Sequence, residues 1–456
     1  MNKVLALALL ALRNAMRSRL VFLLLLLLVA AVVGLPLTVR GDGTVAGQVQ
    51  ILVRYTLGAV LWILALTSVW AGCAAVSLEI QSRRLHLVAT KPVHAFQVWL
   101  GAWLGLLALN AVLLLLGGFA SWLLLHRSLR ERMKEANARA ELEQHILVAR
   151  RLIPAQPVDV EAAAQRRYRD LQAQGTLPAD RPASATIEAI RQVLLQQAFM
   201  VPPDGQHRWS FPAPARLPPG RPLLFRFRYA SSQMGPERIT GLWRVQRGMR
   251  GRAREQITEA AALSPQTFQV PPEGLDGEGP LYVDFINRHP DPRTILFGPA
   301  DGLELLVYEG RFGPNYARTL LILWTQLAFF SAVGVTAGCL FSMPVAAFLS
   351  LFVLFIAQAA GAIQSLAGRP AYYVYGHGTK AAGPLLHLML KLAYGGLYSF
   401  VRPMRLPPVL DAVSTGGLVP WTEVGHLLLT QGLLISLMLG AAAATVLRRR
   451  ELALAE

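Results

Sequence analysis

The residues best suited to a specific contact lie in one short stretch between two long apolar runs, residues 78–105, LEIQSRRLHLVATKPVHAFQVWLGAWLG. Glu79 is the only acidic residue between Asp42 and Glu131, and Arg83 follows it four residues later. Residues four apart lie on one face of a helix, so Glu79 and Arg83 can form an ion pair there. Such an ion pair makes and breaks no covalent bond. It predicts a charged amphipathic helix at the membrane surface, and a solvated loop at a membrane edge is the alternative.

A predicted turn closes this polar stretch. Arg84 extends the basic cluster, and the residues Thr90, Lys91, Pro92 and Val93 then form a Thr-Lys-Pro-Val sequence. Proline disfavours helical geometry at the residue before it, here Lys91. We therefore expect a short amphipathic surface helix, EIQSRRLHLVA, then a turn, and then the next apolar helix.

Motifs of catalysis and nucleotide binding are missing from the sequence. It contains no G-x-x-x-x-G-K-S/T loop, no H-E-x-x-H pair and no G-x-S-x-G elbow, and GHGTK at 376–380 is too short for a phosphate loop. His377 is interpreted as a polar loop residue. His387 and Lys391, four residues apart, either face a cavity or extend to the membrane surface. We expect no enzyme activity, no metal site and no cofactor bound by this chain.

The composition indicates a membrane protein. Of the 456 residues, 54% are hydrophobic and only 16% are charged, with a mean hydropathy of +0.40, whereas about 25% are charged in soluble domains. The net charge is +17, but 21 of the 27 acidic residues fall within 127–316, so the apolar remainder is edged by Arg and Lys. Basic residues that flank apolar runs argue against nucleic-acid binding and favour contact with membrane lipid. Cys73 and Cys339 lie inside apolar runs and are expected to be small buried hydrophobes.

Six transmembrane helices are predicted. A signal peptide is the alternative for the N-terminus, but Arg13 and Arg17 stand where a cleavage site would be, so we favour an interfacial amphipathic helix. The predicted spans are 21–37, 56–78, 97–125, 316–341, 345–367 and 425–447, with an extracytoplasmic or re-entrant segment at 368–423. Basic clusters at both chain ends predict cytoplasmic termini in the inner membrane, and a cytoplasmic loop at 79–96.

The inserted segment 127–316 lacks apolar spans and is predicted to be an extracytoplasmic α+β domain between the membrane regions 1–126 and 317–456. Its first part, 127–200, is charged and helical in character, which predicts a helical stalk. Alternation at period two between Pro- and Gly-rich turns predicts a β-sandwich at 205–312. Its arginine run predicts either a basic edge for an anionic partner or a merely soluble surface: Arg244, Arg247, Arg250, Arg252 and Arg254.

The membrane half resembles the ABC-2-type permease family in the order of its motifs. The residues that carry the resemblance are Glu79, then Arg83 or Arg84, the turn at 90–93 and the Gly-x-x-x-Gly pair Gly101 and Gly105 at the start of the third span. An FSMPVA turn at 341–346 and an RRREL ending agree with it. The resemblance implies that loop 79–96 is a coupling helix that docks on a separate ATPase subunit, and that Gly101 and Gly105 serve helix packing.

The implied function is that of the permease subunit of an ATP-binding cassette exporter. The implied partners are an ATPase subunit, which binds the ATP, and a second copy of the permease. The alternative is a membrane-anchored envelope scaffold, or a signal or force relay, whose extracytoplasmic domain binds a partner. The near absence of ionisable residues from the last three spans opposes a membrane-embedded enzyme, because chemistry inside a membrane needs polar groups.

Overall fold

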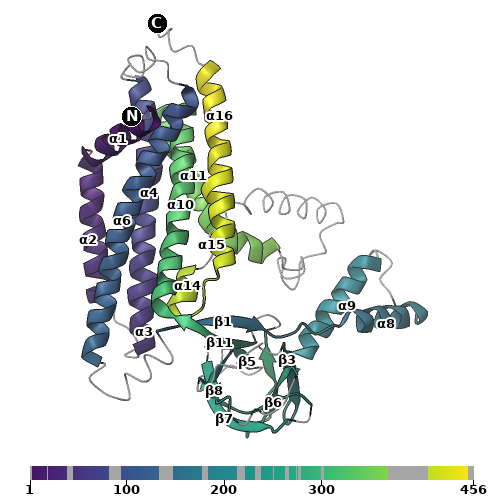
Figure 1. Ribbon diagram of the computed structural model, residues 1–456. Helices are drawn as coiled ribbons and strands as arrows, with labels where there is room; N and C mark the ends of the chain where they lie inside the picture. Colours follow the sequence, from purple (N-terminus) through teal and green to yellow (C-terminus); the bar gives the residue numbers. More distant parts are fainter. Residues whose placement is uncertain are drawn as a thin grey trace. The chain divides into compact units, whose positions relative to one another are not determined.

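The computed structural model divides into two compact units, a helical unit of residues Met1–Leu147 and Arg311–Glu456, and a β-rich unit, Val148–Gly310 (Figure 1). The structure describes residues 3–17, 19–38, 45–81, 94–132, 147–176, 183–212, 221–231, 238–249, 251–261, 266–273, 275, 279–298, 302–367 and 409–449. The β-rich unit has a hydrophobic core of its own. A separate core of this kind is the mark of an independent domain.

The helical unit consists of long apolar helices with short helical pieces between them. In the described part of this unit, two π-helical segments interrupt the series, and in them hydrogen bonds close wider turns than in an α-helix. Its elements are α1 (Lys3–Arg17), α2 (Arg19–Thr38), α3 (Val45–Gln50), η1 (Ile51–Tyr55), α4 (Thr56–Gln81), α6 (Ala95–Arg132), α10 (Phe312–Leu340), α11 (Met343–Ala367), α14 (Val409–Ser414), α15 (Trp421–Leu427), η4 (Leu428–Ile435) and α16 (Ser436–Arg449).

Five helices among the described residues are long and apolar enough to cross a membrane, or six if the bent pair α1 and α2 forms one span. The stretches are Ile51–Gln81, Ala95–Arg130, Phe312–Leu340, Met343–Ala360 and Trp421–Arg449. The prediction of long apolar helices is therefore confirmed for the described part of the chain. Most of the predicted segment 368–423 lies outside the described residues, and its end forms α14 and the start of α15.

Helices α4 and α10 touch through their backbones. A Cβ atom added at Gly72 of α4 would lie 2.9 Å from the backbone nitrogen of Val335, and one at Gly338 of α10 would lie 2.5 Å from the carbonyl oxygen of Cys73. Both distances are shorter than van der Waals contact, so the helices approach this closely only because these positions are glycine. Small residues serve close helix packing in the same way within membranes.

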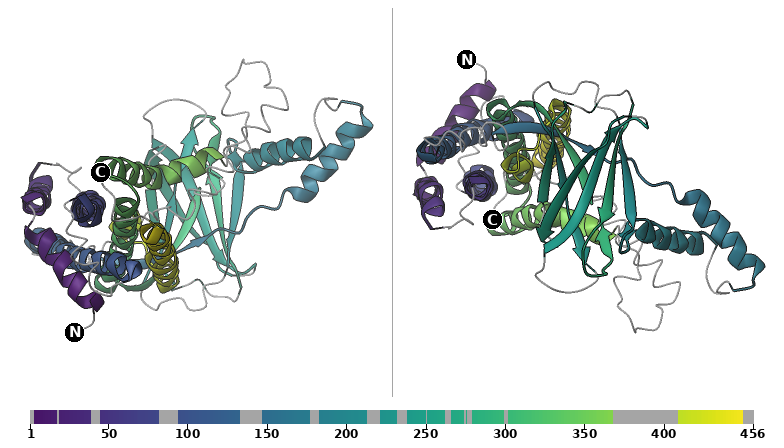
Figure 2. Two further views of the ribbon diagram at one scale, coloured as in Figure 1. Left: turned by 90° about the horizontal axis from the view of Figure 1, so that it is seen from above. Right: turned by 90° about the horizontal axis from the view of Figure 1, so that it is seen from below.

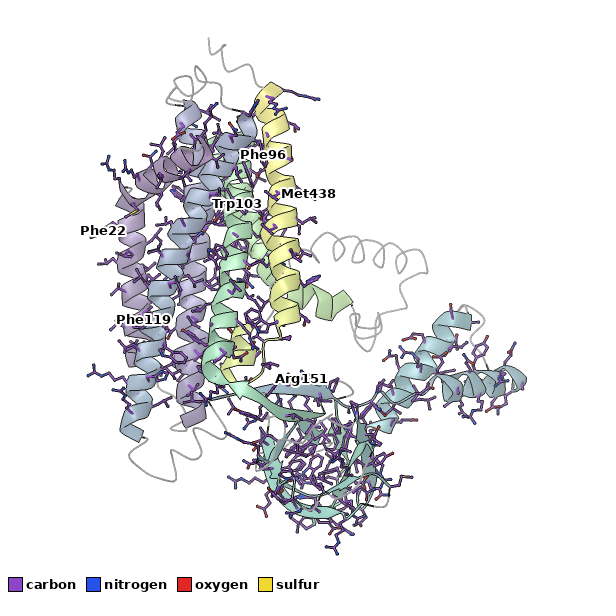
Figure 3. The ribbon with its side chains drawn as sticks, in the orientation of Figure 1. Phe22, Phe96, Trp103, Phe119, Arg151 and Met438 are labelled. Carbon is purple, nitrogen blue, oxygen red and sulfur yellow. The ribbon has the colours of Figure 1, made fainter. Side chains whose placement is uncertain are left out.

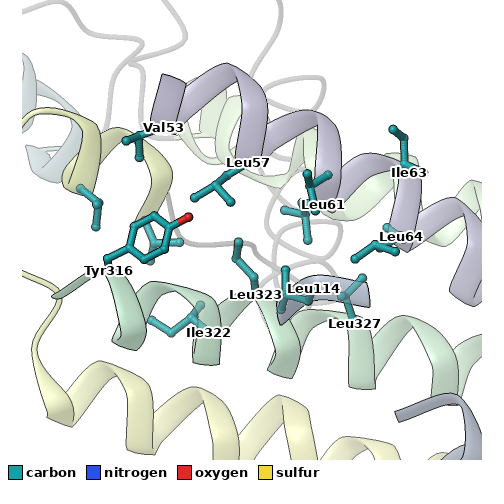
Figure 4. Packing of buried hydrophobic residues seen from close by; sticks show 14 of the residues in the cluster. Val53, Leu57, Leu61, Ile63, Leu64, Leu114, Tyr316, Ile322, Leu323 and Leu327 are labelled. Carbon is teal, nitrogen blue, oxygen red and sulfur yellow. The ribbon is translucent and has the colours of Figure 1, made fainter. Parts of the chain in front are cut away.

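Leucines extend this contact toward the other end of the two helices. Figure 4 shows Leu57, Leu61 and Leu64 of α4 facing Leu323 and Leu327 of α10. All five side chains are buried. The pair α4 and α10 thus forms the centre of the helical unit.

Where the structure describes it, the β-rich unit contains antiparallel strands and two helices. Its strands are β1 (Val148–Pro154), β2 (Met200–Val201), β3 (Gln206–Phe211), β4 (Leu223–Phe227), β5 (Tyr229–Ser231), β6 (Arg238–Arg247), β7 (Arg254–Ala261), β8 (Gln266–Val270), β9 (Leu281–Asn287), β10 (Ile295–Phe297) and β11 (Leu303–Arg311), and its helices are α8 (Glu161–Ala173) and α9 (Ala183–Ala198). The described strands form sheets in the orders β1-β11-β4-β8, β2-β10-β5 and β3-β9-β6-β7. Figure 2 shows them curving around a common interior.

Aromatic side chains fill that interior. The Trp243 ring lies 4.8 Å from the rings of both Phe268 and Phe285, measured between centroids. A Cβ atom at Gly241 would lie 2.1 Å from Cε2 of Phe285, so this glycine makes room for the ring. The strand-like sequence runs of this unit supply six aromatic residues that are buried, whereas a seventh, Tyr282, is half-buried: the six are Phe225, Phe227, Tyr229, Trp243, Phe268 and Phe285. Tyr282 differs because side chains alternate along β9, and its neighbours Leu281 and Val283 point inward.

The segment 127–200 does not form a single helical stalk. Helix α6 continues to Arg132, but β1 then joins the sheet beside β11, and α8 and α9 follow. The charged composition favoured a helix, whereas Pro154 and Pro157 interrupt helical geometry. Pairing with β11 supplies the backbone of β1 with hydrogen-bond partners that the local sequence does not reveal.

Candidate functional site

The predicted coupling loop lies between the end of α4 and the start of α6. Glu79 is half-buried in the last turn of α4, and its carboxylate lies 3.5 Å from the side-chain nitrogen of Asn14 on α1. The remaining predicted loop residues lie outside the described part of the chain: Arg83, Arg84, Thr90, Lys91, Pro92 and Val93. The structure therefore defines the two helices that the loop joins, and the elements that hold those helices.

Helix α1 packs directly on the first turns of α6. A Cβ atom at Gly101 would lie 2.5 Å from Cβ of Leu7, and one at Gly105 would lie 2.6 Å from the carbonyl oxygen of Ala8. Both glycines thus face the backbone of α1. Seen from above in Figure 2, α1 lies across the end of the helical unit while α4 is viewed along its axis.

Two tryptophans hold another face of the same turns of α6. The Trp99 indole is fully buried and donates a hydrogen bond of 3.0 Å to the hydroxyl of Thr336 on α10. Trp103 donates one of 2.9 Å to the carbonyl oxygen of Ala328. A Cβ atom at Gly440 of α16 would lie 2.5 Å from the Trp99 ring, so the indole fits against the backbone of that helix. Phe96 and Trp103 are labelled in this region in Figure 3.

These contacts hold the start of α6 in place against the neighbouring helices. It touches α1 through glycines, and α10 and α16 through buried indoles, while Glu79 connects the end of α4 to α1. Packed interfaces of this kind move as bodies and do not deform continuously. A displacement of the loop between α4 and α6 would therefore be passed to the whole group of helices.

A buried polar chain ties three helices together nearer their middle. Asn110 of α6 accepts a hydrogen bond of 3.1 Å from Ser68 of α4 and donates one of 3.0 Å to Ser331 of α10. All three residues are at most 1% exposed. Hydrogen bonds between helices in a membrane contribute about 0.6 kcal/mol on average, and up to about 1.7 kcal/mol.

Among the described residues, no group of three or more His, Cys, Asp or Glu side chains is placed to hold a metal ion. His377, His387 and Lys391 lie outside the described residues. The described helices present buried hydrogen bonds and close backbone contacts, which suit the transmission of movement.

Part of the predicted basic edge of the β-rich unit is engaged within the fold. Arg244 donates a hydrogen bond of 2.8 Å to Glu255 across β6 and β7, and Arg254 donates one of 2.7 Å to the carbonyl oxygen of Glu273. Arg250 lies outside the described residues. Because Arg244 is paired with a carboxylate, it contributes less to a basic surface than the sequence predicted.

Sequence reasoning missed the residues that fix α6 in place. Trp99, Trp103 and Asn110 stand in an apolar run, where each N–H group needs a partner once it is removed from water. That requirement is the signal that could have identified them.

No protein-family model, curated protein or solved structure matches this chain.

Proposed function

We propose that this chain is the permease subunit of an ATP-binding cassette exporter of the ABC-2 type, driven by a separate ATPase subunit. The observation that carries the proposal is the fixed start of α6, where Gly101 and Gly105 contact α1 and Trp99 contacts α10 and α16. An ATPase that closes on nucleotide can move membrane helices only through a rigid, specifically docked element. The loop between α4 and α6 enters the helical unit at such a place.

In this proposal the chain has six transmembrane helices and cytoplasmic termini in the inner membrane. Exposed apolar side chains on several helices support a lipid environment, and Phe22, Phe119 and Met438 point away from the helical unit in Figure 3. Each is at least 65% exposed. Arg17 at the end of α1 and Arg449 at the end of α16 support a cytoplasmic location for both chain ends. The β-rich unit is then an extracytoplasmic α+β domain built as a β-sandwich.

Two permease copies and two ATPase subunits would form the working exporter. One chain supplies half of a central pathway in the family that it resembles, so the second copy completes it. The loop residues Arg83, Arg84, Thr90, Lys91, Pro92 and Val93, together with Glu79, would form the docking surface.

A second candidate function is that of an envelope scaffold or force relay. It is favoured by the β-rich unit, which has its own aromatic core and a pair of contacting helices, α8 and α9. In that case the helical unit would anchor the chain or transmit force, and the partner would bind outside the cytoplasm.

Purification of the intact chain from its native membrane distinguishes the two functions. The exporter proposal predicts that an ABC-type ATPase copurifies in equal amount, that native mass spectrometry gives two copies of each chain, and that ATP hydrolysis requires the ATPase. Hydrolysis by the isolated chain would contradict the proposal. A complex of one permease with one ATPase would refute the dimer, and a stable extracytoplasmic partner without any ATPase would favour the scaffold.

A further inference from the structure

An apolar groove of about 260 Å³ lies between α6 and α10, away from the predicted coupling loop. Its walls are almost entirely apolar, and it is lined by Leu115, Phe119, Trp122, Gly313, Tyr316 and Leu320. Leu115 is 62% exposed and Phe119 66% exposed, so the groove opens to the surroundings of the helical unit. It therefore offers a long, open apolar surface to a flexible chain.

The floor of the groove is held rigidly. The Tyr316 hydroxyl donates a hydrogen bond of 2.8 Å to the carbonyl oxygen of Gly118, which fixes α10 on α6 at this level. The Trp122 ring lies 5.2 Å from the Tyr316 ring and 5.8 Å from that of Phe312, measured between centroids. The polar atom of Tyr316 is therefore engaged with α6 and is not available to a ligand in the groove.

Cationic side chains stand beyond one end of the groove. Arg127 and Arg130 follow Trp122 on α6, both are exposed, and neither has an ion-pair partner among the described residues. Arg311 is exposed directly before α10, whose first turn contains no acidic residue. Cations at this end and apolar walls along the groove match a ligand with an anionic head and an apolar chain.

The spacing agrees with a phospholipid. Arg130 lies eleven residues after Phe119, which is three turns on the same face and about 16 Å along the helix axis. Half of a hydrocarbon core about 30 Å thick is about 15 Å, the depth reached by one acyl chain. A phosphate at the arginines would therefore place an acyl chain beside Phe119 and Leu115.

We propose that this groove binds one acyl chain of an anionic phospholipid, with Arg127 and Arg130 holding its phosphate. The inference rests on the membrane placement in the proposed function, but not on the ATPase. In that placement these arginines lie outside the cytoplasm, where short segments beside spans usually carry few basic residues. Recognition of an anionic headgroup explains why arginines stand at this end.

The test measures lipid retained by the intact purified chain. The protein is exchanged into detergent with phosphatidylglycerol and phosphatidylcholine of identical acyl chains, and native mass spectrometry counts the bound lipid. The wild type should retain one phosphatidylglycerol per chain in preference to phosphatidylcholine. Removing both cations in Arg127→Gln/Arg130→Gln should weaken that preference by roughly a factor of five per arginine, since each arginine near an anionic surface is worth about this much.

Three further variants separate recognition of the headgroup from binding of the acyl chain. Arg448→Gln/Arg449→Gln removes two cations from the end of α16 and should leave the retained lipid unchanged. Gly313→Leu should fill the groove and reduce retention of both lipids, because a Cβ atom there meets only Trp122, at 3.5 Å, and the larger side chain extends into the hollow. Gly313→Ala adds only the Cβ atom and should keep partial binding, so a graded loss from alanine to leucine assigns the effect to filling of the groove, and an unfolding midpoint near that of the wild type shows that the leucine variant is folded.

Three results would overturn the site. One is equal retention of both lipids by the wild type, and another is undiminished phosphatidylglycerol on folded Gly313→Leu. The third is displacement of the lipid by soluble glycerol phosphate at the concentration of the lipid, which would mean that the headgroup binds alone. None of these readouts involves ATP, so failure of the lipid site and failure of the ATPase partnership are separate outcomes.

Discussion

The side-chain amide of Asn14 on α1 lies 3.5 Å from the carboxylate of Glu79 at the end of α4. These residues are 65 positions apart in the chain, and α1 also packs on the glycines of α6. The N-terminal helix therefore touches both helices that border the predicted coupling loop. Helix α1 thus links the end of α4, which precedes the loop, to the start of α6, which follows it.

Replacing Glu79 by Arg should weaken docking of the ATPase. Truncation of one member of a desolvated interface charge pair costs about 2–5 kcal/mol, whereas a pair exposed at the rim contributes less than about 1 kcal/mol. Since Glu79 is half-buried, we expect a measurable loss of copurified ATPase and of permease-stimulated ATP hydrolysis. Asn14→Ala is the matched control, because it removes the contact with α1 and keeps the carboxylate. Equal losses in both variants would assign the effect to α1 and remove Glu79 from the docking surface.

Replacing Gly101 by Ala should destabilise the helical unit. The new Cβ atom would lie 2.5 Å from Cβ of Leu7, so α1 or α6 must shift, and overpacking of this kind costs about 1–3 kcal/mol. Gly425→Ala on α15 is the control, because no atom lies within 4 Å of its new Cβ atom, and helix propensity then favours alanine by up to about 1 kcal/mol. Thermal unfolding in detergent should show a lower midpoint for Gly101→Ala alone. Equal midpoints would mean that α1 does not pack on α6 in this way.

Asn110→Leu should loosen the contact between α4, α6 and α10. It removes one hydrogen bond to Ser331 and one from Ser68, each worth about 0.6 kcal/mol and at most about 1.7 kcal/mol. A double-mutant cycle with Ser331→Ala isolates the bond between the two side chains. Strict additivity of the two single variants in unfolding free energy would show that this hydrogen bond contributes nothing.

Acid should destabilise the β-rich unit through His207. Burial lowers the pKa of its imidazole below the ordinary value, and a backbone hydrogen bond at Ala198 and the charge of Asp284 oppose this shift only in part. The unfolded chain therefore takes up the proton at a higher pH than the folded chain. The contribution of neutral His207 to the free energy of unfolding is fully present above about pH 6.5. It is lost as the pH falls from that value toward the lowered pKa of the folded state.

Hydrogen exchange of the β3 amides in the intact chain measures this effect. Protection should decrease between pH 7 and pH 5 after correction for the intrinsic exchange rate. His207→Phe keeps a ring between Phe199 and Trp209 and should remove most of the decrease. An unchanged pH dependence in that variant would assign the acid sensitivity to another group.

The sequence predicted those helices and strands that a pattern of neighbouring residues is enough to specify. Long apolar runs identified α4, α10 and α11, since length and composition suffice for such helices. Alternation predicted a β-rich segment at 205–312, but β1 was assigned to a helical stalk. Strand β1 depends on pairing with the distant strand β11. Pairing partners far along the chain leave no trace in a local pattern.

The candidate site was predictable only in part for the same reason. A lone acid and a pair of glycines near an apolar run stand out in the sequence, which is why Glu79, Gly101 and Gly105 were named. The hydrogen bond from Trp99 to Thr336 joins residues 237 positions apart. Its existence depends on how α6 packs against α10, and no spacing rule connects two positions so distant.

Photo-cross-linking from the loop between α4 and α6 tests the central proposal most directly. A photoreactive phenylalanine analogue replaces Arg84 in the intact chain, and a matched variant carries it at Leu123, which is 57% exposed on α6. After irradiation of native membranes, mass spectrometry identifies the partner. Docking of a separate ATPase predicts an adduct that contains ABC-type ATPase peptides from position 84 and none from position 123. An absence of ATPase peptides at position 84, or equal amounts at both positions, would contradict it.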